Sequence, residues 1–178
     1  SDSQLAATAG NGAVQALINP GGERADLTYA SSPAGEGNGV VTYGEVFTVQ
    51  PFGNILQTVT LTGTQIKAAL EQQWQVVNNQ PRQIVLQPSA GLTYSWSASA
   101  PIGSKVSSIV LNGAPLDPNA NYRVTINSFL QGGGDGFSAF TGGTEITGGG
   151  IDLDAFTAYL TAHPNTTPPA LGRITTTP

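Results

Sequence analysis

Apolar side chains recur at every second position in several short stretches of the chain, which is the pattern of a β-strand. Val59 and Leu61 alternate with Thr58 and Thr60, and this alternation predicts a half-buried strand over residues 55–61. Alternation or short apolar runs predict further strands at residues 14–18, 40–43, 45–50, 83–87, 92–97, 105–111, 122–127 and 171–174. Strands therefore dominate the predicted secondary structure.

Two segments in the first half of the chain have helix signals instead. Residues 3–9 have the form of a helix end, because Gly10 and Gly12 follow directly as a stop signal. Thr62-Gly63-Thr64-Gln65 has the sequence of a capping box, and apolar residues follow it at helical spacing. The buried face of this second helix is expected to carry Ile66, Leu70, Trp74 and Val77. We interpret Trp74 as a core residue rather than a ligand-binding one.

A last helix is predicted over residues 152–162, with Asp152 as its N-cap. Its inward-facing side chains are expected to be Leu153, Phe156, Tyr159 and Leu160. The glycine-rich residues 142–150 before it have no apolar periodicity, so we expect them to form a flexible loop. Residues 33–39 are also expected to form a loop.

Composition limits the class of protein. A chain of 178 residues fits one domain with its own core, and 23 glycines and 12 prolines indicate a sheet-containing domain with many turns. A net charge of −5, with six scattered Lys and Arg residues, argues against binding to a nucleic-acid backbone. The absence of cysteine excludes disulfides, thiolate catalysis and cysteine-ligated metals. No apolar run approaches the ~18–20 residues of a membrane span.

The sequence contains no recognisable reaction centre. His163, the only histidine, stands beside Pro164, and we interpret it as structural or solvated. Asp152 and Asp154 are better explained by the positive end of a helix than as a pair of catalytic carboxylates. A binuclear phosphoesterase centre needs several His and Asp ligands. We therefore predict neither a catalytic residue nor a metal site in this chain.

The motif Gly132-Gly133-Gly134-Asp135-Gly136 offers recognition chemistry instead. Four glycines around one carboxylate allow left-handed backbone and the close approach of another group. Phe129 lies six residues before Asp135, at the end of a predicted strand. An aromatic face beside a carboxylate suits a ligand with a flat apolar part and a hydroxyl-bearing part, such as a nucleoside. On this motif alone, a plain glycine-rich connection with a packed Phe129 and a solvated Asp135 remains open.

Two other turns carry side chains suited to binding. The strand at residues 14–18 leads into Asn19-Pro20-Gly21-Gly22-Glu23-Arg24, which places an amide and a guanidinium beside glycines. By itself this motif is equally consistent with a plain turn. Phe52 lies between Pro51, whose φ is fixed, and Gly53, which suits a defined, protruding turn. The alternative is that Phe52 fills the core beneath that turn.

These motifs follow one another in an order that is specific when taken together. The order is Asn-x-Gly-Gly-x-Arg, then Tyr-Gly-x-Val-Phe-x-Val-x-Pro-Phe-Gly-Asn, a capped helix, and Tyr-Arg-Val-x-x-x-x-Phe-x-x-x-Gly-Gly-Asp-Gly-Phe. The chain from Asn19 to about Ile174 thereby resembles the C-terminal domain of 5′-nucleotidases, a family that includes UDP-sugar hydrolases and 2′,3′-cyclic phosphodiesterases. The resemblance implies an α+β fold of mixed β-sheets with helices packed outside. It also implies that residues 1–178 form a single nucleoside-binding domain.

The resemblance assigns a role to each motif. It implies that Phe52 and Phe129 sandwich the base and that Asp135 accepts hydrogen bonds from the ribose hydroxyls. It places Asn19 near the base and Arg24 at the ribose–phosphate end. The implied substrate-binding glycines are Gly21, Gly22, Gly133 and Gly134.

The resemblance also implies a partner. A metallophosphoesterase domain with two divalent metal ions would precede this chain and cleave the phosphate ester, while this chain contributes no cofactor site. We expect the start of the first helix, and a phosphate-binding arginine near it, to be missing here. The chain alone is then expected to bind nucleotide weakly and to hydrolyse nothing, in a protein that is extracellular, cell-surface or periplasmic.

One departure and two alternatives accompany this interpretation. The family usually has an aliphatic residue where this chain has Glu23, and that carboxylate is in position to pair with Arg24 and weaken its hold on phosphate. A non-catalytic structural or adhesion module on the same scaffold remains an alternative. So does a domain of a larger secreted nuclease.

Overall fold

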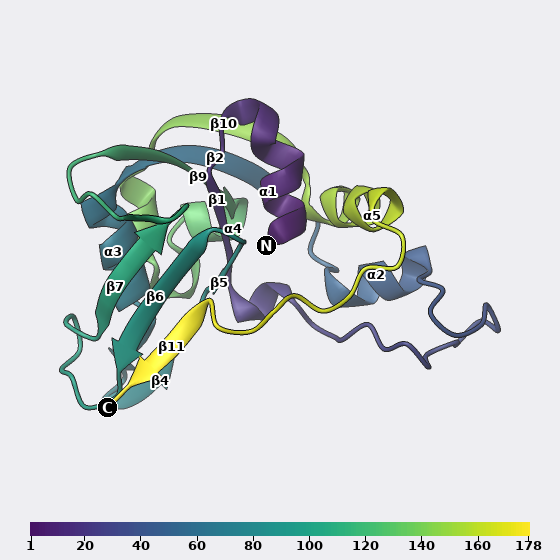
Figure 1. Cartoon of the computed structure of the whole chain (residues 1–178), viewed down its shortest axis with the longest axis horizontal. Coiled ribbons are helices and arrows are strands. Elements are labelled where there is room, and N and C mark those ends of the chain that lie inside the picture. The colour runs from purple at the N-terminus through teal and green to yellow at the C-terminus, as the bar shows by residue number, and fades with distance from the viewer.

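The structure, a computed structural model, describes residues 1–178 and has an α+β fold with three sheets. The first sheet has the strand order β10-β2-β9-β1-β5, in which β1 and β9 run parallel and the other neighbours antiparallel (Figure 1). Its strands are β1 (Gln15–Ile18), β2 (Ile55–Thr62), β5 (Gln87–Pro88), β9 (Asn121–Asn127) and β10 (Thr144–Ile151). The second sheet, β11-β6-β7-β8, consists of β6 (Leu92–Ser97), β7 (Val106–Leu111), β8 (Ala114–Pro115) and β11 (Ile174–Thr177). β3 (Trp74–Val77) and β4 (Gln80–Gln83) form a separate hairpin.

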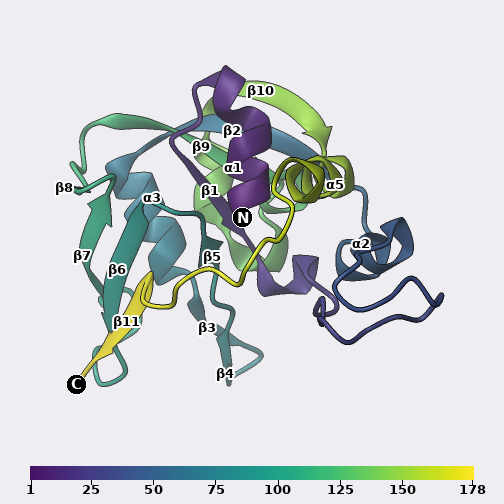
Figure 2. The same cartoon turned by 45° about the vertical axis from the view of Figure 1, so that its right-hand side comes forward.

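Five α-helices are present in all. They are α1 (Asp2–Thr8), α2 (Tyr43–Val49), α3 (Gly63–Glu71), α4 (Ser128–Gln131) and α5 (Asp152–Ala162), with 3₁₀ turns at Ala9–Asn11, Pro20–Gly22, Gly134–Gly136 and Ser138–Gly142. α1 packs over the outside of the first sheet, whereas α3 lies in the core between the two larger sheets. α1 crosses one face of the sheet, and α2 and α5 lie together at the end away from the four-stranded sheet (Figures 1 and 2). The β3–β4 hairpin projects from the lower side of the molecule in Figure 2.

The main core lies between the two larger sheets and includes α3. Ile66 and Leu70 of α3 are buried together with Val59 and Val124 of the five-stranded sheet. The capping box that begins α3 is present as predicted, because Thr62 and Gln65 exchange hydrogen bonds between side chain and backbone. Burying this apolar surface stabilises the fold by about 25 cal/mol per Å² removed from water.

The opposite face of the five-stranded sheet is polar but also covered. Thr125 Oγ1 lies 2.6 Å from Thr8 Oγ1 of α1 and 3.1 Å from Thr58 Oγ1 of β2. Buried hydroxyls need such partners, because an unpaired polar group away from water is costly. The strand that was predicted to be half-buried is therefore covered on both faces.

The predictions of strands at residues 40–43 and 45–50 were both wrong. Residues 40–42 have no regular secondary structure, and Tyr43–Val49 form α2, which begins with a capping box between Thr42 and Glu45. Tyr43 and Phe47, four positions apart, lie on its exposed side. The Thr-x-x-Glu signal was in the sequence, but the β-branched and aromatic residues around it favour a strand on propensity alone.

The prediction of a flexible loop at residues 142–150 was also wrong, because most of them form β10 at the edge of the sheet. Its register against β2 shifts between Thr144 and Thr147 and again between Gly148 and Ile151. The second shift leaves Gly149 and Gly150 without a partner on β2, as in a β-bulge. A Cβ on Gly149 would lie 3.2 Å from Thr8 Cγ2 and Leu56 Cβ. Glycine here lets α1 pack closely over the strand, which a pattern-based prediction has no means to detect.

Three element boundaries differ from the prediction. α3 ends at Glu71, and Trp74 reaches the core from strand β3, so it is a core residue as predicted but not a helical one. The strand expected at residues 83–87 is replaced by the end of β4 and the two-residue β5. The N-cap of α5 is Ile151 instead of Asp152, whose Oδ1 accepts from the N–H of Leu153 inside the first turn.

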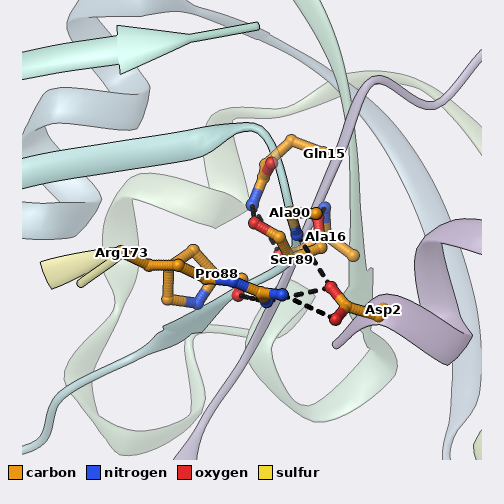
Figure 3. Close-up of polar contacts among 7 residues, drawn as sticks. All are labelled: Asp2, Gln15, Ala16, Pro88, Ser89, Ala90 and Arg173. Atoms are coloured by element: carbon orange, nitrogen blue, oxygen red, sulfur yellow. Dashed lines mark hydrogen bonds and ion pairs between the residues drawn. The ribbon is translucent and has the colours of Figure 1, made fainter. Parts of the chain in front are cut away.

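The chain end is tied to the beginning of the fold just before β11. Arg173 donates from Nη1 and Nη2 to the two carboxylate oxygens of Asp2, at 2.9 and 2.7 Å (Figure 3). Arg173 Nη1 also donates to the carbonyl of Pro88, and the N–H of Ala90 donates to Asp2 (Figure 3). This paired geometry joins α1, β5 and the segment leading into β11.

Candidate functional site

A cleft of about 360 Å³ opens at one end of the central strands of the five-stranded sheet. The parallel strands β1 and β9 both terminate at this end, and the antiparallel β2 begins there, with Leu56 opposite Asn127. The turns that follow β1 and β9 and precede β2 therefore meet. The residues lining the cleft are Asn19, Gly21, Gly22, Arg24, Phe52, Asn54, Phe129 and Asp135. Seven of the nine predicted substrate-binding residues are among them, and Gly133 and Gly134 are not.

The two aromatic side chains of the cleft are exposed. Phe52 retains 55% and Phe129 46% of its accessible surface, whereas Phe137 is completely buried in the main core. Phe129 belongs to the one-turn helix α4 and does not end a strand, which corrects the prediction. Asn127 caps this turn, because its Oδ1 accepts from the N–H of Leu130 at 2.8 Å. The turn presents the ring to the cleft while Leu130 stays buried beneath.

Glycines after α4 support the Phe129 ring. A Cβ on Gly134 would lie 2.5 Å from Phe129 Cε1 and 2.6 Å from Cδ1, closer than real contacts allow. Only a residue without a side chain fits under the ring in this position. Gly133 has a φ of +83° and reverses the chain between α4 and Asp135. Both glycines therefore act behind the cleft surface rather than on it.

The Asp135 carboxylate is held from two sides. Its φ of 56° is left-handed, as expected for a tight turn between glycines. Asn19 Nδ2 donates to Asp135 Oδ2 at 2.9 Å, and Arg82 Nη2 lies 3.1 Å from Oδ1. Asn19 is itself buried, and its Oδ1 accepts from Asn127 Nδ2 at 3.1 Å. These bonds connect the turn after β1, the cap of α4 and the glycine loop.

The site also contains three residues that were not among the predicted site residues, namely Asn54, Arg82 and Asn127. Asn54 lines the cleft, and its Nδ2 donates to Asp152 Oδ2 at 3.2 Å, which anchors the Phe52 turn to the start of α5. Burial raises the pKa of the Asp152 carboxyl above its ordinary value, although hydrogen bonds from Asn54 and Leu153 oppose this. Asn54 belongs to the same Pro-Phe-Gly-Asn motif as Phe52, so the sequence contained a signal for it. Arg82 comes from a hairpin that no cleft motif includes.

Arg24 lies at the rim of the cleft. Its guanidinium carbon is 5.8 Å from the centre of the Phe52 ring, within the range of a cation–π contact. Its backbone N–H donates to the carbonyl of Val49, which ties the loop after β1 to the end of α2. Glu23, which is in position in the sequence to pair with Arg24, forms no ion pair with it; the ion pairs of the structure are Lys67–Glu71, Arg82–Asp135 and Arg173–Asp2.

The rest of the chain supplies no second centre of this kind. A larger hollow of about 870 Å³ lies between α5 and residues 166–174, and none of the predicted site residues lines it. His163 is exposed and stacks on Tyr159, with ring centres 4.2 Å apart. No group of three or more His, Cys, Asp or Glu side chains is placed to hold a metal ion. No helix combines the length and apolar character required to cross a membrane.

The fold is that of an α+β domain whose cleft is lined by two exposed aromatic rings and one carboxylate. The sequence model of the 5′-nucleotidase, C-terminal domain matches residues 1–142. The chain belongs to this family.

Similar proteins agree in fold and differ in length. The chain is 39% identical over 148 residues to the cell wall protein Lmo0130 of Listeria monocytogenes, which covers 82% of this chain and 18% of that protein. It is 36% identical over 172 residues to the trifunctional nucleotide phosphoesterase protein YfkN of Bacillus subtilis, covering 92% and 11%. The structure of a 5′-nucleotidase precursor from Thermus thermophilus superposes with a TM-score of 0.80 and 33% identity, over 98% of this chain and 34% of that one. The chain therefore spans a fifth or less of the length of the first two relatives.

Proposed function

We propose that this chain is the nucleoside-recognition domain of a 5′-nucleotidase-type phosphohydrolase. The observation that carries the proposal is that Phe52 and Phe129, 77 positions apart, line one cleft together with Asp135. Exposed rings scattered singly over a surface are ordinary, but two half-exposed rings that line the same concave cleft beside a carboxylate favour a ligand site. Asn19, Arg24, Gly21 and Gly22 complete the proposed site.

The chemistry of the cleft fits the parts of a nucleotide. Stacking of a base on an aromatic ring contributes ~1–3 kcal/mol and tolerates any base, so broad base preference is expected. The Asp135 carboxylate accepts hydrogen bonds from the ribose hydroxyls. Arg24, at the rim, presents a fork of donors that matches a phosphate. In this assignment the base lies between Phe52 and Phe129, and the phosphate points out of the cleft.

Hydrolysis is assigned to a different part of a longer protein. This chain gathers no cluster of metal-ligating side chains, so the two divalent metal ions that the family resemblance implies would be held by a preceding metallophosphoesterase domain. The similar proteins are several times longer than this chain, which leaves room for such a domain. Residues 1–178 then form a single substrate-binding domain of that protein. The likeness to a cell wall protein supports a location outside the cytoplasm.

The test is a titration of the chain with AMP and adenosine, by calorimetry or NMR, for the wild type, Phe52→Ala, Phe129→Ala and Phe137→Ala. Either cleft variant should weaken binding by ~1–3 kcal/mol with little change in the melting temperature, because an exposed ring has little packing to lose. Phe137→Ala should instead lower stability by ~3–5 kcal/mol. The wild-type chain should release no phosphate from AMP with any divalent metal. If both cleft variants unfold as severely as Phe137→Ala, the aromatic clamp is wrong.

The likeness to a cell wall protein also supports a second candidate. A structural or adhesion module would keep the scaffold without using the cleft. In that case, AMP and adenosine would not bind saturably to the wild-type chain or to a version that includes the preceding sequence.

A further inference from the structure

The β3–β4 hairpin holds Asp135 at both its backbone and its side chain. Gln75 and Arg82 are opposite one another in the hairpin register. Gln75 Nε2 donates to the main-chain carbonyl of Asp135 at 3.0 Å, and Arg82 Nη2 donates to its Oδ1 at 3.1 Å. Asn78 and Asn79 form the tight turn of the hairpin, with φ of 51° and 58°. The turn geometry fixes the register that sends both side chains to the same residue.

Core packing anchors the hairpin through Trp74 of β3, but it does not account for the position of the Arg82 side chain on β4. All four residues of β4 are exposed, and Arg82 keeps 45% of its side-chain surface. The Asp135 side chain keeps only 19%. An ion pair this exposed contributes ~0–1 kcal/mol to stability, so Arg82 does little to hold the fold together. Its effect should instead be found in what Asp135 can bind.

The hydrogen-bonding capacity of Asp135 shows how Arg82 acts. An ionised carboxylate has about four acceptor positions, two on each oxygen. Asn19 occupies one position on Oδ2 and Arg82 occupies one on Oδ1. One position on each oxygen is left, which matches the two donors of a vicinal diol. With a donor on each oxygen, the carboxylate plane is fixed before a ligand arrives, and less rotational freedom is lost on binding.

We propose that Arg82 is a positioning residue that sets the selectivity of the cleft for sugars with a free 2′,3′-diol. This inference rests on the proposed function, because it gives Asp135 the ribose as its ligand. Asn19 alone leaves the carboxylate free to turn about the Asn19 bond, and Arg82 removes that freedom. The base-stacking rings are not affected, so a nucleoside without the diol gains nothing from Arg82.

The experiment compares adenosine with 2′,3′-dideoxyadenosine, which stacks equally but lacks both hydroxyls. Affinities are measured by NMR titration for the wild type, Arg82→Ala, Arg82→Lys and Lys67→Ala. Lys67→Ala removes the same charge from an ion pair on α3, and Lys67 does not line the cleft. Arg82→Ala should weaken adenosine binding about three- to tenfold, the range of one hydrogen bond, and leave the dideoxy analogue unchanged. Arg82→Lys should restore most of the loss, because the contact uses a single donor, while Lys67→Ala should behave as the wild type.

The outcomes separate this inference from the proposed function. An equal loss for both ligands, or no loss for either, would overturn the role of Arg82 while nucleoside binding stands. No saturable binding of either ligand to the wild type would overturn the proposed function and this inference with it. The melting temperature of Arg82→Ala should stay near that of the wild type, and a large drop would mean that the hairpin is needed for folding instead.

Discussion

Asn19 Nδ2 lies 2.9 Å from Asp135 Oδ2, although 116 positions separate the two residues in the chain. Asn19 is 4% exposed and makes two side-chain hydrogen bonds. Its Oδ1 accepts from Asn127, and its Nδ2 donates to Asp135. An amide is the side chain that can accept on one side and donate on the other. The position of the Asp135 carboxylate therefore depends on the end of β1.

Replacing Asn19 with Asp keeps the shape and removes the donor. Asn19→Asp should lower stability at neutral pH by ~1–3 kcal/mol, because it leaves two carboxylates in contact in a largely buried place. The measurement is chemical denaturation at pH 7, with Asn119→Asp as control, since Asn119 is exposed and its side chain has no hydrogen-bond partner. Equal stabilities for the two variants would show that the Asn19–Asp135 bond contributes nothing.

A second prediction concerns the support of the Phe129 ring. Gly134→Ala would bring its Cβ to within 2.5 Å of the ring, which must then swing aside. Because the ring is 46% exposed, it has room to move, so the melting temperature should change little. The affinity for adenosine should fall by ~1–3 kcal/mol, the value of one stacking contact. Gly148→Ala is the control, because a Cβ there meets nothing within 4 Å. Unchanged adenosine binding in Gly134→Ala would contradict the role of the ring.

The sequence predicted the elements whose pattern is local. β6 and β7 were found because alternation or apolar runs mark them, and α3 because Thr62 and Gln65 form its capping box. β10 was missed because its glycines have no pattern of their own and become a strand only by pairing with β2. For the site, motif order identified seven residues of the cleft lining. Arg82 was beyond reach, because it depends on where a hairpin 53 positions from Asp135 projects in space.

A third prediction follows from the Asp2–Arg173 pair. Burial by itself would raise the pKa of the Asp2 carboxyl, but hydrogen bonds from Arg173 and the Ala90 N–H outweigh it and hold the pKa below its ordinary value of 3.8. A depressed pKa in the folded state means that the stabilisation is complete above the ordinary value and is lost as the pH falls through the folded one. The melting temperature of the wild type should therefore fall more steeply below about pH 4 than that of Asp2→Asn.

The control for Asp2 is Asp26→Asn, because Asp26 is exposed and its side chain makes no hydrogen bond. Asp26→Asn should follow the wild-type melting curve from pH 7 down to pH 2. If Asp2→Asn follows it equally closely at every pH, the pair in Figure 3 contributes no pH-dependent stability.

The last prediction separates the phosphate end of the proposed site from the base. The guanidinium of Arg24 makes no hydrogen bond within the protein and lies 5.8 Å from the Phe52 ring, so its donors are free for a ligand. Arg24→Ala should weaken AMP binding by ~1.5–3 kcal/mol, the value of a hydrogen bond to a charged group. Adenosine, which has no phosphate, should lose at most the ~0.5–1 kcal/mol of the cation–π contact that steadies Phe52. Arg24→Lys should keep the charge but lose the fork geometry, so its AMP affinity should lie between those of the wild type and Arg24→Ala.

Glu23 provides the matched control for this prediction. It lies next to Arg24 in sequence but forms no ion pair with it, so Glu23→Ile removes an adjacent charge without freeing the guanidinium. Both charges are exposed, and at 0.15 M salt the Debye length of ~8 Å leaves only a small effect on AMP. AMP and adenosine affinities of Glu23→Ile should thus stay near those of the wild type. A clear gain for AMP alone would mean that Glu23 does hold Arg24 in solution, and an equal loss for AMP and adenosine in Arg24→Ala would mean that Arg24 contacts no phosphate.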